Sequence, residues 1–346
     1  MRSIPRYHAN GGCIRPTLSR IAMPYFLLLL VLFVTLALVV MAGPRVSVHY
    51  QPTRIRLPHD PQDLDDYLAD AEAKIPDLTE GAERAVIWAH PDRRRTAFSI
   101  VYVHGFAATR REVAPLADLV ARTLGANLHY ARLRGHGRSG QAMAQVTLQD
   151  WLDDMRESMA IGRLIGDQVI LVGTSTGGTL ATWVSMQDHT PSPAALVLLS
   201  PNFGPRRWET ALLTWPWARH FVPWIQGDSY SWLPHNAAHA RYWTTRFPVE
   251  GLFPMAAAVK LVRSLDPSGL EVPILILYAP EDGVVDATRI EGFYRRLTIQ
   301  PRRLVSIEDT ADPDRHILAG DILSPDTTGP VASHILAFLD QAIPQR

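Results

Sequence analysis

The stretch GTSTG at residues 173–177 places Ser175 among very small neighbours, directly after the apolar run QVILV and directly before the helix-like segment TGGTLATWVSM. In a strained turn between a strand and a helix, a serine hydroxyl points outward, and glycines two residues before and after it let the strand and the helix pass closely. The sequence therefore predicts that Ser175 is a nucleophile and that Gly173 and Gly177 make room for its turn.

Two backbone N–H groups are candidates for stabilising the negative oxygen that forms when a serine attacks a carbonyl carbon. The N–H of Thr176 lies at the start of the expected helix, where the helix dipole also favours negative charge. A second donor is expected in the loop after an earlier strand, and the segment SIVYVHGFAATRRE places the N–H of Phe106 there. His104 is then expected to support this loop, and Thr109 with Glu112 to cap the helix that follows.

A serine hydroxyl becomes a strong nucleophile only when a base takes its proton, and that base needs a carboxylate to orient it. In a strand–turn–helix site of this kind the chain order is Ser, acid, His. The histidines after the serine are His189, His220, His235, His239, His316 and His334. Only His316, in DTADPDRHILAG, falls in a loop after the last expected strand, because the others fall in helical segments or within residues 201–265. We therefore expect His316 to be the base.

The acid is expected directly after the apolar run VPILILYAP, where EDGVVD offers Glu281, Asp282 and Asp286. Asp282 stands first in the loop proper, and the GVV that follows it would turn the chain toward the next helix. We favour Asp282, with Asp286 as the alternative that would otherwise cap that helix. Three further carboxylates precede the histidine too closely to orient its ring easily: Asp309, Asp312 and Asp314.

From residue 85 onward, apolar runs of strand length alternate with longer amphipathic stretches. The expected strands are AVIWAH, AFSIVYVHGF, NLHYARL, QVILVG, AALVLLS, VPILILYAP and RLVSIED. The expected helices cover residues 110–124, 148–165, 176–187, 288–297 and 331–342. Thr147 with Asp150 is expected to cap the second of these helices. Near-continuous apolar strands alternating with helices predict an α/β fold whose sheet is mostly parallel and covered by helices on both faces.

One interval breaks this alternation. Residues 201–265 hold six of the nine tryptophans, and prolines recur through the same interval. We expect an inserted cap of short, kinked helices here. Aromatic walls bury acyl-chain area well, so the cap favours an apolar or acyl-chain small-molecule substrate. The same aromatic residues could instead form the core of the cap itself.

The N-terminal part of the chain has a different composition. Residues 21–44 carry no charge and are long enough to cross a hydrocarbon core of roughly 30 Å as a helix, so we expect an uncleaved transmembrane anchor there. A cleaved signal peptide is the alternative, but residues 40–42 fit the small-x-small cleavage pattern poorly. The basic tail at residues 1–20 favours a cytoplasmic N-terminus and an exported catalytic domain. Residues 45–84 are expected to form a stalk or outer segment, and residues 85–346 the main domain.

The motifs HGF, RLRGHGRSG, GTSTGG, APEDGVVD and DRHILAG follow one another in this order, and as a set they resemble the α/β-hydrolase superfamily. Within it, the chain is similar to the branch of serine esterases, monoacylglycerol-lipase-like enzymes and serine aminopeptidases. The resemblance implies Ser175 as nucleophile, Asp282 as acid and His316 as base. It also implies the N–H groups of Phe106 and Thr176 as oxyanion donors. The anchor and the stalk segment fall outside the resemblance.

Composition and two near-motifs narrow the function further. The formal net charge is zero, so we expect no nucleic-acid partner, and the only cysteine, Cys13, leaves no thiol nucleophile in the main domain. Residues 135–140 satisfy G-x-G-x-x-G, but a poor helix opening follows and no acidic residue stands where a ribose would need it, so we expect a structural loop and no cofactor. His235 and His239 are spaced to share a helix face, but without nearby thiolates we expect no metal.

These observations together predict a membrane-anchored serine hydrolase that cleaves acyl esters, as a carboxylesterase or lipase-like enzyme, through an acyl-enzyme intermediate. Amide- and thioester-cleaving hydrolases of the same fold are alternatives. Another alternative is a hydrolase-fold protein without turnover that serves as a membrane-tethered binding module. The presence of every required residue type argues against it.

Overall fold

The computed structural model of the chain describes residues 18–188 and 190–343, with side chains described from residue 23 onward. Most of the expected basic tail, together with Cys13 and His189, lies outside the described residues. The chain divides after Pro44 into two compact units. The first unit contains one described helix, and the second, called the main unit below, begins at Arg45 and contains the sheet.

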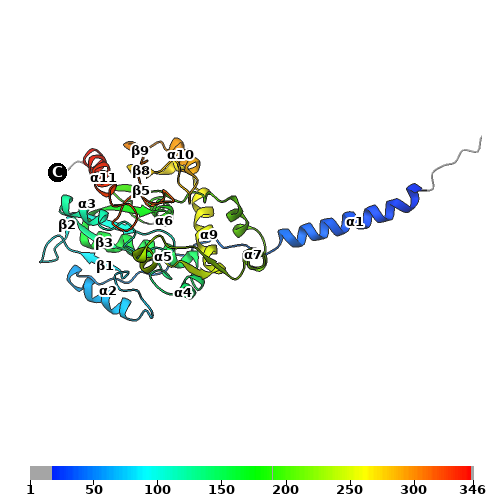
Figure 1. Ribbon diagram of the computed structural model, residues 1–346, viewed down its shortest axis with the longest axis horizontal. Coiled ribbons are helices and arrows are strands. Elements are labelled where there is room, and N and C mark those ends of the chain that lie inside the picture. Colours follow the sequence, from blue (N-terminus) through cyan, green and yellow to red (C-terminus); the bar gives the residue numbers. More distant parts are fainter. Residues whose placement is uncertain (1–17, 189, 344–346) are drawn as a thin grey trace, which may run out of the picture. The chain divides into compact units, whose positions relative to one another are not determined.

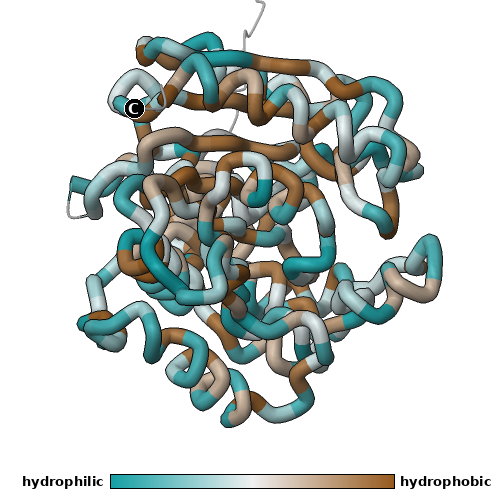
Figure 2. Tube along the Cα trace, turned by 90° about the vertical axis from the view of Figure 1, so that its left-hand side faces the viewer, coloured by the Kyte–Doolittle hydropathy of each residue, from teal (hydrophilic) through white to brown (hydrophobic). Residues whose placement is uncertain are grey.

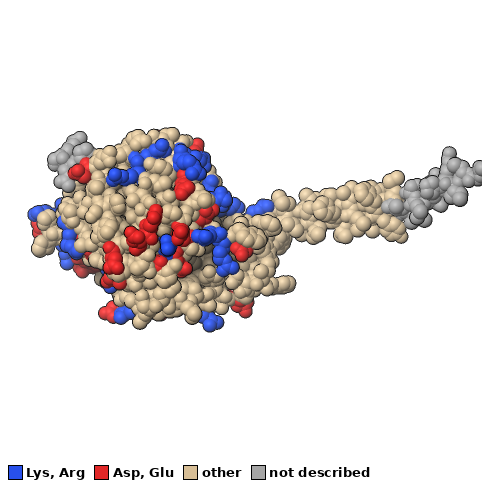
Figure 3. Space-filling model, turned by 45° about the horizontal axis from the view of Figure 1, so that its top comes forward, with Lys and Arg blue, Asp and Glu red and all other residues tan. Residues whose placement is uncertain are grey.

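The helix of the first unit, α1 (Leu18–Met41), is apolar over its described side chains. Over Met23–Met41 its mean hydropathy is 2.7, and none of this stretch is buried. Over Met23–Met41 the sequence has no charged residue, and Figure 3 shows none on the visible face of this stretch. Length and composition make α1 a candidate membrane span, and a signal sequence near an N-terminus meets the same two criteria.

Seven strands form one sheet in the order β1-β3-β2-β4-β5-β8-β9 (Figure 1). Neighbouring strands run parallel, except that β1 is antiparallel to β3. All seven expected strands are present, and the expected mostly parallel sheet is confirmed. The strands are β1 (Ala85–Ile87), β2 (Thr96–Val103), β3 (Asn127–Tyr130), β4 (Gly166–Thr174), β5 (Ala195–Leu199), β8 (Ile274–Tyr278) and β9 (Arg302–Ser306).

Helices cover both faces of the sheet, as expected. Because alternate side chains of a strand point to opposite faces, Val101 and Leu171 lie in one core with α5, α6 and α9, and Ile100 and Ile170 lie in the other with α3 and α11. Figure 2 shows hydrophobic segments crossing the interior of this unit and hydrophilic stretches at many of its outer turns. The helices are α3 (Leu116–Leu124), α4 (Gly140–Ala144), α5 (Leu148–Ile165), α6 (Thr176–Ser185), α9 (Leu252–Arg263), α10 (Ala287–Arg296) and α11 (Thr328–Ala342).

The two capping predictions have different outcomes. A capping box at Thr147 and Asp150 starts α5, as expected. The expected cap at Thr109 and Glu112 is wrong, because α3 begins several residues later and has no such cap. The carboxylate of Glu112 instead accepts a hydrogen bond from the N–H of Gly105 (2.8 Å). The carboxylate thus binds a buried N–H of the preceding loop, and not the N–H of Thr109 that a capping box would require.

Within residues 201–265, the stretch before α9 forms short elements and one small sheet that the sequence did not predict. The antiparallel strands β6 (Ser229–Ser231) and β7 (Arg246–Pro248) are only three residues each, too short for a readable alternation of apolar and polar residues. At the end of the interval, α9 packs against α6 in the main core. The remaining elements are η2 (Trp208–Thr214), α7 (Ala218–Gln226), α8 (Ala237–Tyr242) and η3 (Val249–Gly251).

Residues 45–84 form an outer layer of the main unit. The hydroxyl of Tyr50 donates to Oδ1 of Asp153 (2.9 Å), and its ring meets the ring of Trp183 edge-on at 5.0 Å. Further along, the helix α2 (Leu64–Ala73) follows the short turn η1 (Pro61–Asp63) and buries its apolar side chains against α5. A last short turn, η4 (Pro267–Gly269), precedes β8.

Candidate active site

Ser175 lies between the end of β4, the central strand of the sheet, and the start of α6. Its backbone has φ 51° and ψ −117°, and its N–H donates to the carbonyl oxygen of Leu199 (2.8 Å). A positive φ is uncommon for a residue with a side chain and persists only where the surrounding packing fixes it. The turn therefore holds the Ser175 side chain in one direction.

Gly173 and Gly177 lie where a side chain would collide with the backbone. A Cβ atom on Gly173 would be 2.6 Å from the carbonyl oxygen of Gly177. A Cβ atom on Gly177 would be 2.2 Å from the carbonyl oxygen of Val103. Strand β4, helix α6 and the end of β2 thus approach one another more closely than any side chain at these two positions would allow.

Asp282 and His316 form a buried pair at the ends of the last two strands. The ring Nδ1 of His316 lies 2.8 Å from Oδ2 of Asp282, so an Nδ1–H donates to the carboxylate and Nε2 is left to accept a proton. The other carboxylate oxygen, Oδ1, accepts hydrogen bonds from the N–H groups of Val284 (2.8 Å) and Val285 (2.9 Å). The backbone therefore fixes Asp282, and Asp282 fixes the histidine ring.

The electrostatic surroundings of His316 favour its protonated form. Burial alone lowers the pKa of His316, but the charge and hydrogen bond of Asp282 raise it, and the charges of Asp312 and Glu112 add to this, so that its pKa lies above the usual value. Asp312 also holds the loop, since its Oδ2 accepts from the N–H groups of His316 (3.0 Å) and Ile317 (2.8 Å). Asp312 therefore holds the histidine backbone and leaves the ring to Asp282.

The other two acids of this loop have different partners. Asp286 accepts from the N–H of Thr288 (3.0 Å) and caps α10, the role that the sequence offered it as an alternative. Glu281 pairs with Arg315 at the surface (2.7 Å). Of the three acids considered, only Asp282 is hydrogen bonded to the histidine ring among the described residues.

The two amides expected to bind an oxyanion belong to loops that follow adjacent strands. Thr176 begins α6 after β4, and Phe106 follows β2 in a loop where Ala107 has a φ of 60°. Neither the Phe106 N–H nor the Thr176 N–H donates to another group among residues 18–188 and 190–343. Both N–H groups are therefore unused within the described residues, and of the two residues Phe106 lines the cavity described next.

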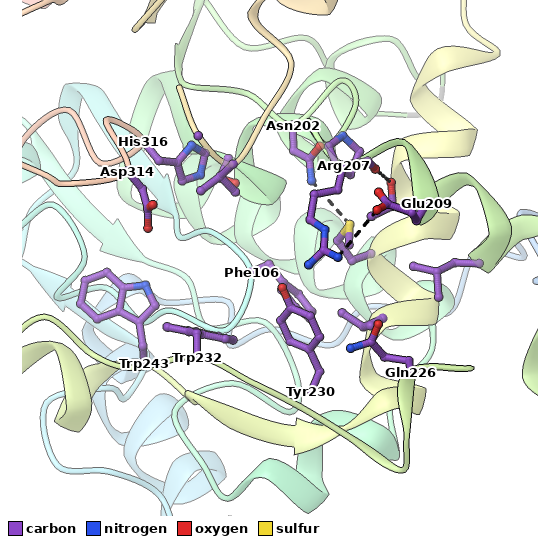
Figure 4. A pocket seen from close by; sticks show the side chains of 18 of the residues that line it. Phe106, Asn202, Arg207, Glu209, Gln226, Tyr230, Trp232, Trp243, Asp314 and His316 are labelled. Carbon is purple, nitrogen blue, oxygen red and sulfur yellow. Dashed lines mark hydrogen bonds and ion pairs between the residues drawn. The ribbon is translucent and has the colours of Figure 1, made fainter. Parts of the chain in front are cut away.

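One cavity of about 460 Å³ contains Ser175, His316 and Phe106 in its lining. Figure 4 shows His316 on one side of this cavity and the rings of Tyr230 and Trp243 on the facing side. Among the described residues no hydrogen bond joins the Ser175 hydroxyl to the His316 ring. Apolar side chains of the insertion supply much of the remaining wall: Leu213, Phe221, Val222, Ile225, Trp232, Leu233, Leu252 and Met255.

A few polar side chains interrupt the apolar wall. Nε2 of His235 lies 3.6 Å from a carboxylate oxygen of Asp314, and ligand atoms of His235, Asp312 and Asp314 all lie within 4.8 Å of one another. These three residues, and not the pair His235 and His239, are the ones whose donor atoms could meet at a cation. The ring of His239 instead accepts from the N–H of His235 through Nδ1 (3.2 Å). On the insertion side, Arg207 and Glu209 pair at 3.8 Å.

Two residues that support the site were missed by the sequence analysis. Arg206 donates from Nη1 to the carbonyl oxygen of Asp282 (2.7 Å) and so holds the acid loop. The N–H of Asn202 donates to the carbonyl oxygen of Ser175 (3.0 Å), and its side chain lines the cavity. Both follow β5, and their position after the carboxyl end of a central parallel strand was the available signal.

The G-x-G-x-x-G stretch at residues 135–140 is a packed turn. Gly135 and Gly137 have φ of 82° and 67°, values that favour glycine. A Cβ atom on Gly140 would be 2.1 Å from the carbonyl oxygen of Arg246. The positive φ at Gly135 and Gly137 and the close approach at Gly140 account for the three glycines.

The chain matches one protein family and is similar to several solved structures. The family model described as serine aminopeptidase, S33, matches residues 95–311. No curated protein matches the chain. A structure described under LipS and LipT, two metagenome-derived lipolytic enzymes, is similar with a TM-score of 0.64 and 21% identity, over 76% of this chain and 99% of that one.

Two further structures are monoglyceride lipases. A soluble variant of monoglyceride lipase from Saccharomyces cerevisiae, in complex with a substrate analog, has a TM-score of 0.58 and 13% identity, over 79% of this chain and 97% of that one. Monoacylglycerol lipase from Paleococcus ferrophilus has a TM-score of 0.54 and 14% identity, over 75% of this chain and 98% of that one. At these identities the likeness shows a shared fold.

Proposed function

Because this chain belongs to the serine aminopeptidase S33 family and has the α/β-hydrolase fold, we propose that it is a serine hydrolase with Ser175 as nucleophile, His316 as base and Asp282 as acid. One observation carries the proposal. Ser175 in its strained turn and His316, whose ring is paired with the buried Asp282, line the same cavity although they come from distant parts of the chain.

The reaction follows from these positions. Nε2 of His316 takes the hydroxyl proton of Ser175 as Oγ bonds to the substrate carbonyl carbon, and the N–H groups of Phe106 and Thr176 donate to the resulting oxyanion. The tetrahedral species then breaks its bond to the leaving group, which receives the proton from His316. A water molecule next gives a proton to His316 as its oxygen bonds to the acyl carbon. The bond from this carbon to Oγ then breaks, Oγ receives the proton from His316, and the acid is released. Asp282 holds the ring and stabilises its protonated form.

We infer that the substrate is an ester with an apolar acyl chain. The cavity holds about 460 Å³, within the range of small-molecule sites, and aromatic and aliphatic side chains of the insertion line it. Burial of the chain methylenes against such walls is worth about 0.8 kcal/mol for each CH₂. Similar structures include lipolytic enzymes and monoacylglycerol lipases, which agrees with this substrate class.

Amide hydrolysis is the second candidate, and one feature of the cavity favours it. Of the carboxylates that line the cavity, Glu209 and Asp314 are exposed and would attract the amino group of an aminoacyl substrate. The description of the matched family as serine aminopeptidase agrees with this candidate. Esters remain first because neither carboxylate is buried and the larger part of the lining is apolar.

Labelling with a fluorophosphonate probe tests whether Ser175 is a reactive nucleophile. We expect the full chain in detergent to be labelled on Ser175 and the variant Ser175→Ala to lose both label and activity, the latter on the order of 10⁴-fold to 10⁶-fold. Ser185→Ala removes a hydroxyl from the same helix α6 and should leave labelling unchanged. An unlabelled wild-type chain that is folded would favour the non-catalytic binding module.

A substrate panel separates the two candidate reactions. We expect p-nitrophenyl esters to be hydrolysed with a kcat/KM that rises with acyl length until the cavity is filled. Aminoacyl p-nitroanilides should be poor substrates. A preference for the anilides, abolished by Glu209→Gln or Asp314→Asn, would instead assign the amide reaction.

We further propose that α1 anchors the enzyme in a membrane through residues 21–44, with the main unit on the exported side. The apolar stretch Met23–Met41 and the arginines before it support this orientation. A reporter fused after Arg346 that is active only when exported should give signal. Signal from a cytoplasmic reporter would reverse the orientation.

A further inference from the structure

A buried carboxylate that the proposed reaction does not use lies beneath the loop of the oxyanion donor. Glu112 is 1% exposed, and its Oε2 accepts hydrogen bonds from the N–H of Gly105 (2.8 Å) and from the hydroxyl of Tyr102 (2.9 Å). That hydroxyl also lies 3.0 Å from Oγ1 of Thr174, the residue before the nucleophile. One carboxylate thus connects the loop that carries Phe106 to the strand that carries the serine.

Glu112 is also close to the nucleophile in space. A Cβ atom built on Gly105 would be 2.6 Å from Oε1 of Glu112 and 3.1 Å from Cβ of Ser175. Less than the room for one methyl group therefore separates the carboxylate from the nucleophilic residue. Glu112 lines the same cavity as Ser175 and His316, so its charge acts inside the reaction site.

Two titratable side chains act on the Glu112 carboxylate, and they come from different elements. Tyr102 on β2 donates to it, and His316 in the loop after β9 interacts with it through charge. Arg111, its neighbour in the chain, turns away toward Asp321 (3.8 Å). No arginine or lysine among the described residues pairs with the Glu112 carboxylate, so the histidine is the cation with which its charge interacts.

The state of this carboxylate is sensitive to pH in the neutral range. Burial raises the pKa of Glu112 to about 7, and the N–H of Gly105, the Tyr102 hydroxyl and the charge of His316 limit the rise. In return, the negative charge of Glu112 raises the pKa of His316, together with the charges of Asp282 and Asp312. The two titrations are therefore coupled.

We propose that Glu112 is a positioning residue of this site, whose carboxylate fixes the loop of Phe106 and whose negative charge sets the pH at which His316 becomes a free base. The inference rests on the proposed serine hydrolase function. The two roles of Glu112 can be tested separately, because an isosteric amide keeps the hydrogen bonds to the loop and removes the negative charge.

The first test compares Glu112→Gln with the wild type. A glutamine oxygen in the place of Oε2 can accept from both the N–H of Gly105 and the hydroxyl of Tyr102. The loop should therefore stay in place, and the maximal rate of fluorophosphonate labelling should remain within about threefold. Loss of the charge lowers the pKa of His316, so the acidic limb of the labelling rate should move to lower pH by about half a unit or more. The labelling rate is measured from pH 5 to pH 9 on the full chain.

Two further variants separate the loop from the charge. Glu112→Ala leaves the Gly105 N–H without its acceptor, so the maximal rate should fall by about tenfold to 100-fold. Tyr102→Phe removes one donor to the carboxylate, which raises the pKa of Glu112, so the limb should move in the same direction as in Glu112→Gln but by less. Because Tyr102→Phe changes a single hydroxyl, it decides the question if Glu112→Gln does not fold.

A matched control comes from the neighbouring strand, where the hydroxyl of Tyr130 donates to Asp118 outside the cavity. Asp118→Asn should leave the limb unmoved. An unmoved limb in both Glu112→Gln and Tyr102→Phe, in enzyme that is still labelled, would overturn the role of the charge. A maximal rate unchanged in Glu112→Ala would overturn the role in the loop. Absence of labelling in the wild type would instead count against the serine hydrolase.

Discussion

The two carboxylate oxygens of Asp282 have different partners, and this division makes the residue hard to replace. Oδ1 is held by the N–H groups of Val284 and Val285, and only Oδ2 meets the ring of His316. An amide at this position keeps its oxygen on the two backbone donors and presents its NH₂ to the histidine. The ring would then have to accept at Nδ1, which is the wrong tautomer for a base at Nε2.

We therefore expect Asp282→Asn to lower kcat by about 10⁴-fold while the fold is kept. Asp286→Asn, a matched change in the same loop, can still cap α10 and should change kcat by less than about threefold. Steady-state kinetics of both variants check this. Comparable losses in the two variants would mean that the acid has been misassigned.

The environment of His316 also sets a pH dependence. Its pKa is raised above the usual value by Asp282, and a base must be unprotonated to act, so activity should fall as the pH drops through this raised pKa. We expect the acidic limb of kcat/KM to lie above the ordinary histidine value of about 6.5. A kcat/KM profile that stays flat down to pH 5 would contradict the assignment of His316.

At the scale of elements, one buried ion pair network holds the outer layer on the sheet. Glu72 on α2 accepts from Arg84 (Nε to Oε1, 2.8 Å) just before β1, and from Arg132 (Nε to Oε2, 2.7 Å) just after β3. Its side chain and that of Arg132 are each 5% exposed. The network thus joins a segment that precedes the sheet to the sheet edge.

Glu72→Gln leaves the buried Arg132 without its anion and leaves Arg84 with Glu157 (3.1 Å) alone, so we expect it to lower the free energy of unfolding by about 3 kcal/mol. Glu80→Gln, which removes an exposed partner of Arg241, should cost at most about 1 kcal/mol. Urea denaturation of both variants at pH 7 measures the difference. Equal midpoints would show that the network adds nothing.

The contribution of Glu72 to the free energy of unfolding also depends on pH. Burial on its own raises the pKa of Glu72, but Arg132 and Arg84 lower it below its usual value overall. A group with a depressed folded pKa stabilises the fold above its unfolded pKa of about 4.3, and this contribution is lost as the pH falls through the folded pKa. The contribution should therefore be complete at neutral pH, and in Glu72→Gln the acid dependence should be weaker.

Elements were predictable from the sequence where local pattern and tertiary structure agree. The apolar runs of the seven strands and the capped helix α5 are examples, because a buried parallel strand is apolar throughout and a capping box is local. The start of α3 was not predictable, since the Glu112 carboxylate binds the N–H of Gly105, seven residues earlier, and caps no helix. The β6–β7 hairpin was missed because each strand is only three residues long.

The candidate site divides in a similar way. Ser175 and its glycines lie in one continuous motif. His316 is predictable because, of the histidines that follow Ser175, it alone falls in a loop after the last expected strand. Arg206 and Asn202 belong to no motif, and their contacts with Asp282 and Ser175 join segments that are far apart in the chain. Their position after β5 indicates that they lie near the site, but their spacing does not indicate these partners.

At the scale of the whole molecule, the division after Pro44 separates the candidate anchor from a unit with its own cores. We expect a chain that begins at Arg45 to fold, to remain in the supernatant after high-speed centrifugation and to react with a fluorophosphonate at a rate within about threefold of the full chain. The full chain should stay with membranes after alkaline carbonate extraction. Carbonate release of the full chain would contradict the anchor.

The positions of the three site residues along the chain determine the order in which they are synthesised. Ser175 follows β4 in the middle of the sheet, whereas Asp282 and His316 follow β8 and β9 at its far edge, near the end of the chain. During synthesis, the serine leaves the ribosome more than one hundred residues before the histidine that we propose as its base. On the proposed mechanism, the unfinished chain is therefore expected to stay inactive until His316 has been made.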